Sequence, residues 1–177
     1  MGDVTKPNNN WYGYPTCFTV WQPSDFTDKT FKVGDWFVLS PNSTFNDDTC
    51  AQRATKAAMT LFPHSAPIDC KFDAASQNMF ITYHGSWNRQ PTTGFKLVAV
   101  PFKKQEDGTF WPVDPITSTT AAKDIFYNPN VERCTGGGPG MSSGCFRPAG
   151  LAFDKGGRLF MTSDISSNGE LWILGQN

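Results

Sequence analysis

The sequence contains few charged residues and few histidines, and these shortages exclude several classes of function. Charged residues make up 18% of the 177 residues, the formal net charge is −1, and no basic run occurs. A chain without clustered positive charge is poorly suited to binding nucleic acid or an anionic membrane surface. The only histidines are His64 and His84, and no two cysteines are spaced as C-x2-C, so a mixed Cys/His metal site lacks ligands.

Long apolar segments are lacking as well. No stretch approaches the roughly 20 consecutive apolar residues that cross a bilayer, and residues 1–15 contain no apolar region of the kind found in a secretory signal peptide. N-myristoylation is excluded because Lys6 stands where Ser or Thr is required. In the opposite direction, Asn42-Ser43-Thr44 forms an N-glycosylation sequon, which supports secretion weakly.

Glycine, proline and aromatic residues are abundant instead. The chain has 16 Gly, 13 Pro, 15 Phe and 6 Trp, and long helical heptads are absent. This composition is typical of short strands joined by many turns. It predicts a turn-rich, mostly β protein.

Five cysteines leave room for two disulfides. Cys134 and Cys145 flank a Gly-rich loop, and a bond between them would stabilise the protein by about 2–3 kcal/mol by closing that loop. Cys17 with Cys50 is the second candidate pair, which leaves Cys70 over. Connectivity cannot be deduced from sequence, so both pairings remain hypotheses at this point.

Two segments of the sequence, 66–87 and 147–174, resemble each other. Each runs from a proline through Phe-Asp and a turn into an apolar stretch, so that Phe72-Asp73 matches Phe153-Asp154. The turn of the second copy, Asp-Lys-Gly-Gly, is typical of a hairpin because Gly adopts positive φ. The pattern therefore predicts an antiparallel sheet that occurs twice.

Each copy is expected to continue into a third strand, at 96–101 in the first and at 170–174 in the second, and 125–127 should complete the first sheet. Repeated short-stranded sheets with aromatic and Gly marks are typical of β-propeller blades. We therefore predict an all-β fold that forms part of a β-propeller, with about two to three antiparallel four-stranded blades.

The blades are assigned to residues 63–130 and 145–177, and a partial blade to 1–62. The partial blade should contain a strand at 16–21 and one short helix at 51–59. Because propellers close with roughly 4–8 blades, this number cannot close a ring. An open arc would leave strand edges unpaired.

The segment His84-Gly85-Ser86-Trp87-Asn88-Arg89 carries the most chemical information. It follows an expected strand, and its side chains could line a polar pocket in which Trp87 stacks on a planar ring and Arg89 forks onto a carboxylate. The alternative is a loop held by its own hydrogen bonds, with Trp87 as packing, and spacing alone favours this alternative.

Other candidates have ordinary interpretations. Spacing alone makes His64 a buried, hydrogen-bonded structural residue, Arg147 an exposed residue at a strand end and Asp164 a turn residue. Gly140–Gly144 satisfies G-x-S-x-G, but it lacks the strand before and the helix after that a nucleophile elbow needs. The glycines at 136–140 lack the G-K-[ST] ending of a phosphate loop.

Four stretches carry a resemblance to a known family. YHGSWNRQPTTGFKLVAVPF, HSAPIDCKFD, FRPAGLAFDKGGRLFMTSD and NNNWYGYPTCFTVW resemble the soluble quinoprotein glucose/sorbosone dehydrogenases, and most closely the fungal pyrroloquinoline-quinone (PQQ)-dependent pyranose dehydrogenases. The resemblance runs through nearly all of the chain, and H-G-S-W-N-R is quite specific. It implies a secreted, six-bladed propeller that holds PQQ beside calcium and takes a hydride from the anomeric carbon of a sugar.

The resemblance also implies which residues bind the cofactor. It assigns His84, Trp87, Asn88 and Arg89 to the cofactor pocket, and Arg147 resembles an Arg that binds a cofactor carboxylate. PQQ is an aromatic tricarboxylate, which suits stacking and guanidinium forks. A quinone beside calcium and Arg is electron-poor, which favours hydride acceptance.

Several elements of that family have no match in this sequence. The general-base His, an Arg-Asn pair and the calcium-ligand loop of the family precede the region that resembles 8–15, and neither histidine matches the base. The haem cytochrome and carbohydrate-binding modules are also absent. We therefore expect a carboxy-terminal portion of such an enzyme, with no catalytic residue and no metal ligand of its own.

Two functions from different classes follow. The first is a fragment of a secreted PQQ-dependent sugar dehydrogenase, inactive alone, whose partners are a sugar and a cytochrome or other electron acceptor. The second is a non-catalytic secreted β-sheet module that binds sugar or quinone and self-associates through open edges. A hydrolase is a poor third.

Overall fold

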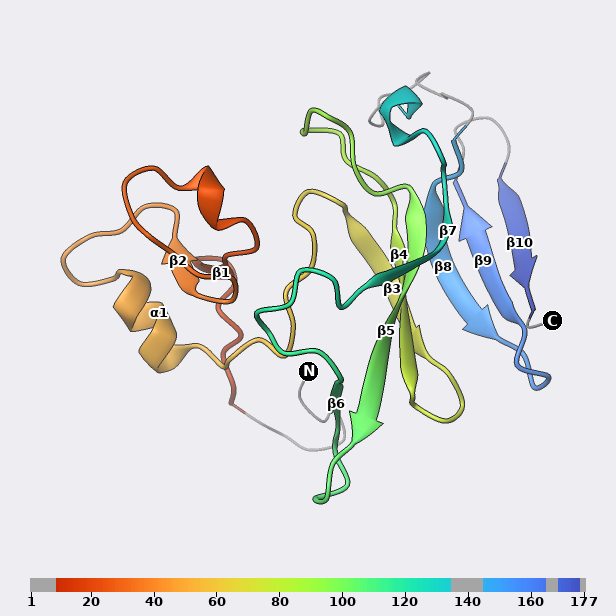
Figure 1. Cartoon of the computed structure of the whole chain (residues 1–177), viewed down its shortest axis with the longest axis horizontal. Coiled ribbons are helices and arrows are strands. Elements are labelled where there is room, and N and C mark those ends of the chain that lie inside the picture. Colours follow the sequence, from red (N-terminus) through yellow and green to blue (C-terminus); the bar gives the residue numbers. More distant parts are fainter. Residues whose placement is uncertain (1–8, 135–144, 165–168, 176–177) are drawn as a thin grey trace. The chain divides into compact units, whose positions relative to one another are not determined.

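The structure is a computed structural model that describes residues 9–134, 145–164 and 169–175 (Figure 1). The chain divides into two compact units. Met1–Leu61 with Asp114–Ala121 form the first, and Phe62–Val113 with Ala122–Asn177 form the second. Each unit is described by itself.

The first unit contains a small two-stranded sheet and a short helix. Strand β1 (Cys17–Thr19) pairs antiparallel with β2 (Trp36–Val38), and helix α1 spans Asp47–Arg53. A 3-10 turn at Pro23–Asp25 lies between the strands in sequence. The strand predicted at 16–21 is therefore confirmed over Cys17–Thr19.

The helix predicted at 51–59 is wrong in its bounds, since α1 begins four residues earlier and ends at Arg53. Asn46 starts it: the Asn46 side chain accepts from the Thr49 N–H at 3.1 Å, and the Thr49 hydroxyl accepts in turn from the Asn46 N–H at 3.3 Å. This reciprocal capping satisfies two N–H groups that a helix start leaves unpaired. Ala54 is extended and ends the helix.

The cysteines pair as hypothesised. Cys17 is bonded to Cys50, which ties β1 to α1, and Cys134 is bonded to Cys145. Cys70 is free and exposed. Within the described ranges no helix is long and apolar enough to cross a membrane.

The second unit consists of two antiparallel sheets. The first has β3, β4, β5 and β6 in that order, with β7 also paired to β5, and the second has the order β10-β9-β8. The strands are β3 (Pro67–Phe72), β4 (Asn78–Tyr83), β5 (Lys96–Lys104), β6 (Phe110–Pro112), β7 (Lys123–Tyr127), β8 (Pro148–Phe153), β9 (Leu159–Ser163) and β10 (Glu170–Leu174). The predicted third strands and the pairing of 125–127 with the first sheet are thus confirmed.

The two repeats also agree in register. The β3–β4 and β8–β9 hairpins both shift register at the same place, near their first residues. The equivalent pairs are Phe72–Met79 and Phe153–Leu159 at one end, and Pro67–Tyr83 and Pro148–Ser163 at the other. The sequence repeat is therefore a structural repeat, and the fold of the described residues is all-β.

A threonine fills each register shift. Thr82 Oγ1 accepts from the Asp69 N–H at 3.0 Å, and Thr162 Oγ1 accepts from the Gly150 N–H at 2.8 Å. Each hydroxyl replaces a ladder partner that the bulge removes. Because the two hairpins match through this point, the residues that follow β4 and β9 occupy equivalent positions.

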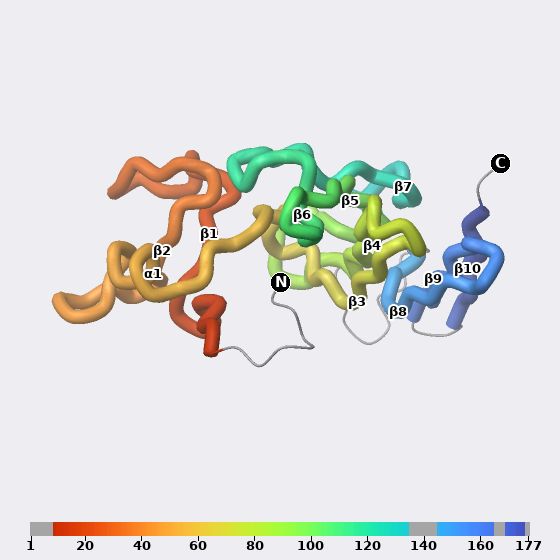
Figure 2. The backbone as a smooth tube through the Cα atoms, turned by 90° about the horizontal axis from the view of Figure 1, so that it is seen from below, coloured from red at the N-terminus to blue at the C-terminus, as the bar shows by residue number. Residues whose placement is uncertain are grey.

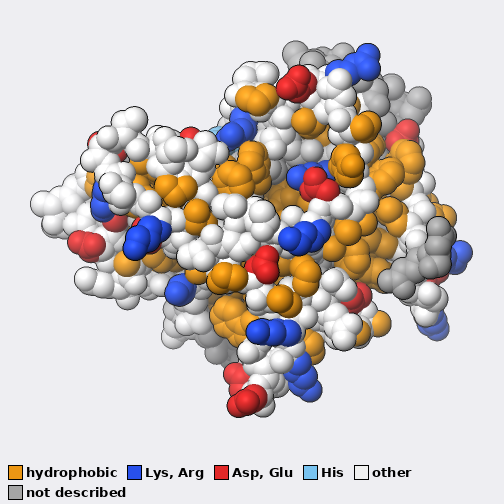
Figure 3. Space-filling view, in the orientation of Figure 1, with side chains coloured by type: hydrophobic (Ala, Val, Ile, Leu, Met, Phe, Trp, Pro, Cys, Tyr) orange, Lys and Arg blue, Asp and Glu red, His pale blue; other side chains and the backbone are white. Residues whose placement is uncertain are grey.

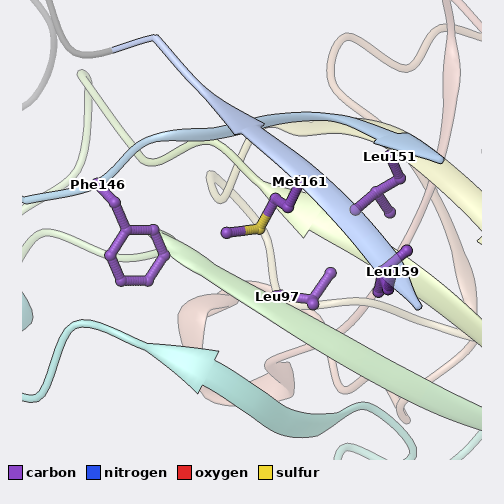
Figure 4. Packing of buried hydrophobic residues seen from close by; sticks show 5 residues of the cluster. All are labelled: Leu97, Phe146, Leu151, Leu159 and Met161. Carbon is purple, nitrogen blue, oxygen red and sulfur yellow. The ribbon is translucent and has the colours of Figure 1, made fainter. Parts of the chain in front are cut away.

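The core of the second unit lies between its two sheets, where β8 contacts β3 and β4 (Figure 2). Leu97 of β5 packs against residues of the second sheet and of the segment before it (Figure 4). The buried members of this cluster are Leu97, Phe146, Leu151, Leu159 and Met161. Polar bonds join the sheets as well: Thr82 Oγ1 donates to the Ala149 carbonyl at 2.7 Å.

Candidate functional site

The predicted cofactor loop begins where β4 ends, and backbone hydrogen bonds fix its start. The His84 N–H donates to the Ala66 carbonyl at 2.9 Å, and the Gly85 N–H donates to the Ser65 carbonyl at 3.1 Å. Gly85 has φ +115°, and a Cβ at that position would overlap the buried ring of Phe95. Only glycine fits this first turn of the loop without strain.

Ser86 closes the base of the loop. Its N–H donates to the Thr93 carbonyl at 2.8 Å, and its Oγ accepts from the Thr93 N–H at 3.0 Å. The loop is thus held by its own hydrogen bonds, as one interpretation of the sequence required. Trp87 does not pack, however, because 77% of its surface is exposed. The indole is free to stack on a ligand.

His84, Arg147 and Asp164 form a hydrogen-bonded cluster that joins the two sheets of the second unit. His84 Nε2 lies 2.6 Å from Asp164 Oδ1, and His84 Nδ1 lies 3.1 Å from Arg147 Nη2. Arg147 Nε lies 3.7 Å from the same Asp164 oxygen, which is an ion-pair distance but too long for a hydrogen bond. The structure therefore brings together two of the five predicted cofactor residues.

The chemistry of the partners assigns the protons in this cluster. A guanidinium only donates, so His84 Nδ1 accepts from Arg147 and carries no proton. A carboxylate only accepts, so His84 Nε2 carries the proton and donates it to Asp164. Both ring nitrogens of His84 are therefore engaged, and the ring is not free to act as a general base.

One nitrogen of the Arg147 side chain donates no hydrogen bond within the described part of the chain. The backbone of Arg147 is fixed, because its N–H donates to Ser163 Oγ at 2.9 Å and its carbonyl accepts from the Asp164 N–H at 3.2 Å. Nε of its side chain is buried without a hydrogen-bond partner, and Tyr83 Oη is the other such atom among the described side chains. Burying a guanidinium donor without a hydrogen bond is costly. The Arg147 side chain as a whole is 24% exposed, so other atoms of the guanidinium could meet an anionic ligand.

Asn88 and Arg89 contact other residues of the second unit instead. Asn88 Oδ1 lies 3.2 Å from His64 Nδ1, and the Arg89 guanidinium lies 4.9 Å from the centre of the Phe62 ring. His64 is hydrogen-bonded as expected, but it is exposed rather than buried. The assignment of Asn88 and Arg89 to the cofactor pocket stays a prediction.

Asp164 was predicted only as a turn residue, so its part in this cluster was missed. It follows β9 at the position that His84 occupies after β4. The alignment of the two sequence repeats makes Asp164 equivalent to His84, and this was the signal that could have identified Asp164 as a site residue. The ends of β4 and β9 lie close together where the two sheets pack, so the pair meets across 80 residues of sequence.

The G-x-S-x-G and Gly-rich motifs between 136 and 144 lie outside the described residues. Within residues 9–134, 145–164 and 169–175, no group of three or more His, Cys, Asp or Glu side chains could hold a metal ion.

Comparison with known proteins gives full-length matches to this chain. The sequence model of the TrAA12-like family matches residues 1–177. A PQQ-dependent pyranose dehydrogenase of Coprinopsis cinerea is 41% identical over 177 residues, which cover 98% of this chain and 24% of that protein. A PQQ-dependent sugar dehydrogenase of Hypocrea jecorina is 34% identical over 180 residues, which cover 100% of this chain and 36% of that protein.

Solved structures match as well. The holo form of the pyranose dehydrogenase PQQ domain from Coprinopsis cinerea has a TM-score of 0.89 at 40% identity, over 99% of this chain and 42% of that one. A calcium structure of a Trichoderma reesei carbohydrate-active enzyme of family AA12 has a TM-score of 0.79 at 36% identity, over 94% of this chain and 38% of that one. The chain spans 24% to 36% of the length of these curated relatives.

Proposed function

The chain belongs to the TrAA12-like family, and from this premise we propose that its second unit forms part of the PQQ site of a sugar dehydrogenase. The observation that carries the proposal is the partly exposed guanidinium of Arg147, which His84 and Asp164 hold in place. A guanidinium suits a carboxylate of the cofactor because it can form charge-assisted hydrogen bonds with it.

Arg147, His84 and Trp87 would each hold the cofactor in a different way. Arg147 binds a carboxylate, His84 orients the guanidinium from its Nδ1 side, and Trp87 offers an exposed indole for stacking on the ring system. When bound, PQQ supplies a quinone that accepts a hydride from the sugar. Asn88 and Arg89 contact His64 and Phe62 in this structure and would complete the polar side of the pocket.

No residue described here is assigned to proton abstraction. His84 has both ring nitrogens in hydrogen bonds, and His64 does not match the family base. We expect the base and the calcium ligands to come from outside these 177 residues, so the chain alone should not oxidise sugars. The sugar and an electron acceptor such as a cytochrome would be partners of the whole enzyme. The two disulfides suit an extracellular location of that enzyme.

The same premise supports a six-bladed propeller. The two repeated hairpins, with matching register shifts, would be parts of successive blades at 63–130 and 145–177, and 1–62 would supply part of an earlier blade. Four strands of the first sheet, β3, β4, β5 and β7, match the size of a blade. The blade boundaries stay a prediction.

Direct titration with PQQ tests the proposed function. The chain should bind PQQ saturably in calorimetry, and Trp87→Ala should weaken binding about fivefold, because ring stacking contributes about 1 kcal/mol. Trp111→Ala is the matched control, since Trp111 is a half-exposed tryptophan on β6. Absence of binding by the folded chain, or equal losses in the two variants, contradicts the proposed site.

The non-catalytic alternative has one observation in its favour. Strand β10 is at the edge of its sheet, and Leu171 and Ile173 are exposed by 62% and 56%. Figure 3 shows hydrophobic side chains gathered over the part of the second unit where Figure 1 labels β7, β8 and β9. Such a surface could pair two copies. Sedimentation as a stable monomer at dilute concentration would count against this alternative.

A further inference from the structure

Asp164 is exposed by 60%, yet its Oδ1 reaches His84 Nε2 at 2.6 Å. We propose that Asp164 is a positioning residue, which selects the ring tautomer of His84 and through it holds Arg147 toward the cofactor. The part of this inference that concerns PQQ rests on the proposed function, whereas the part that concerns the tautomer does not.

The cluster is consistent in one protonation pattern only. Because Asp164 accepts the Nε2 proton, Nδ1 is left as the acceptor that Arg147 Nη2 requires at 3.1 Å. Without the carboxylate, no acceptor would hold the proton on Nε2, and the Nδ1–H tautomer would face the guanidinium with a second donor. The guanidinium would then leave His84, and the buried Nε would lose its orientation.

A direct ion pair between Asp164 and Arg147 does not explain how Asp164 would hold the guanidinium in place. Asp164 Oδ1 is 3.7 Å from Arg147 Nε, and the carboxylate is mostly in solvent, where charge pairs contribute little. The short contact is the one to His84, whose side chain is only 16% exposed. The influence of Asp164 on Arg147 therefore passes through the imidazole ring.

The backbone holds Asp164 in place for this role. Its N–H donates to the Arg147 carbonyl at 3.2 Å, so the acid and the arginine are fixed to each other. Its position after β9 matches that of His84 after β4. Two successive repeats thus present one member each to a shared hydrogen bond.

Nitrogen-15 NMR of the histidine rings tests the tautomer directly, and the chain has only two histidines. Wild type should show His84 protonated at Nε2. Asp164→Ala should shift the His84 ring nitrogens toward the Nδ1–H tautomer and should weaken PQQ binding about tenfold. Asp164→Asn should keep the tautomer, because its carbonyl oxygen still accepts, and should stay within about threefold of wild type.

Asp124→Asn is the control, because Asp124 forms an ion pair with Lys96 in the same unit and the variant removes the same charge. It should change neither signal. Unchanged His84 shifts in Asp164→Ala, with PQQ still bound, would overturn the positioning role and leave the proposed function standing. The expected shift in Asp164→Ala, together with no PQQ binding by the folded wild-type chain, would instead overturn the proposed function.

A second, independent observation concerns the loop between β2 and α1. The side-chain Oδ1 of Asn42 accepts three hydrogen bonds, from the Thr44 N–H at 2.9 Å, the Thr44 hydroxyl at 2.9 Å and the Phe45 N–H at 2.8 Å. Among the described residues, no hydrogen bond uses Asn42 Nδ2, and residues 42–44 are exposed. The nitrogen that would carry a glycan therefore faces solvent.

We infer that Asn42 is an N-glycosylation site. Nδ2 forms a bond to the anomeric carbon of an oligosaccharide and loses one proton, while the lipid diphosphate that carried the sugar leaves. Attachment precedes folding, so the fold must only accommodate the product. The Asn42 turn does so because it uses the oxygen of the side chain and leaves the nitrogen outside.

Expression in a fungal host with an added secretion leader tests this site. The secreted chain should lose about 2–3 kDa on treatment with an N-glycosidase. Asn42→Gln and Thr44→Ala should abolish the difference, and Thr44→Ser should retain it, since serine also completes a sequon. A secreted wild-type chain that is insensitive to the enzyme, or a difference that survives Asn42→Gln, would overturn the assignment.

Discussion

Replacing Gly85 by Ala is expected to lower the free energy of unfolding of the second unit by about 3–5 kcal/mol. Gly85 has φ +115°, which costs a residue with a side chain about 1–3 kcal/mol. The added Cβ would also overlap the ring of Phe95, which is only 1% exposed and cannot move aside, and overpacking costs about 1–3 kcal/mol more. Equilibrium unfolding in urea measures the loss.

Gly108→Ala provides the control for this variant. Gly108 also has positive φ, at +84°, but a Cβ there would meet nothing within 4 Å. It should therefore show the conformational cost alone. Equal losses in the two variants would mean that the contact with Phe95 does not constrain the loop.

Gly85→Ala should also affect the site, because Gly85 connects His84 to the loop that carries Trp87. Moving the backbone at Gly85 changes the hydrogen bond to Ser65 and the direction in which the loop leaves β4. PQQ affinity measured under conditions where the variant remains folded should therefore fall together with stability. The glycine thus links the packing of the core to the geometry of the site.

The strands of the second unit were predictable because local sequence encodes them twice. Phe-Asp, a turn and an apolar run occur in both hairpins, and the side chain of each Asp accepts backbone N–H groups of its own turn, at Gln77 in the first and at Gly156 in the second. Such signals act over a few residues. The register shifts carry no comparable signal, since they depend on hydroxyls of Thr82 and Thr162 across the hairpin.

The helix shows the limit of composition as a guide. Alanines at 51–58 favour a helix, but α1 instead begins at the reciprocal cap of Asn46 and Thr49. The acidic side chains of Asp47 and Asp48 in the first turn add to that start. Capping therefore determined where the helix starts more than intrinsic propensity did, and the cap residues could have been recognised in the sequence.

The candidate site was predictable only in part, for a physical reason. His84 and Arg147 were identified through the family resemblance, and the structure brings them together at 3.1 Å. Their meeting depends on the packing of two sheets, which no local pattern encodes. Asp164, an ordinary residue after a strand, gained its partner in the same way.

Arg147→Ala is expected to weaken PQQ binding about 100-fold, which is the largest effect on affinity predicted for any residue of the site. The partly exposed guanidinium would supply a charge-assisted bond to a cofactor carboxylate, and such bonds contribute about 1.5–3 kcal/mol. Arg147→Lys keeps the charge but loses the planar fork, so it should recover only about tenfold of that loss. Calorimetric titration with PQQ measures all three chains.

Two further measurements separate ligand binding from folding. The backbone bonds of Arg147 to Ser163 and Asp164 do not involve its side chain, so Arg147→Ala should unfold at nearly the wild-type urea concentration. His84 should keep its Nε2 proton, since Asp164 still accepts it. Arg158→Ala is the matched control, because Arg158 is an exposed arginine in the turn between β8 and β9. An Arg147→Ala affinity within twofold of this control would refute the assignment of Arg147 to the cofactor, and with it the observation on which the proposed function rests.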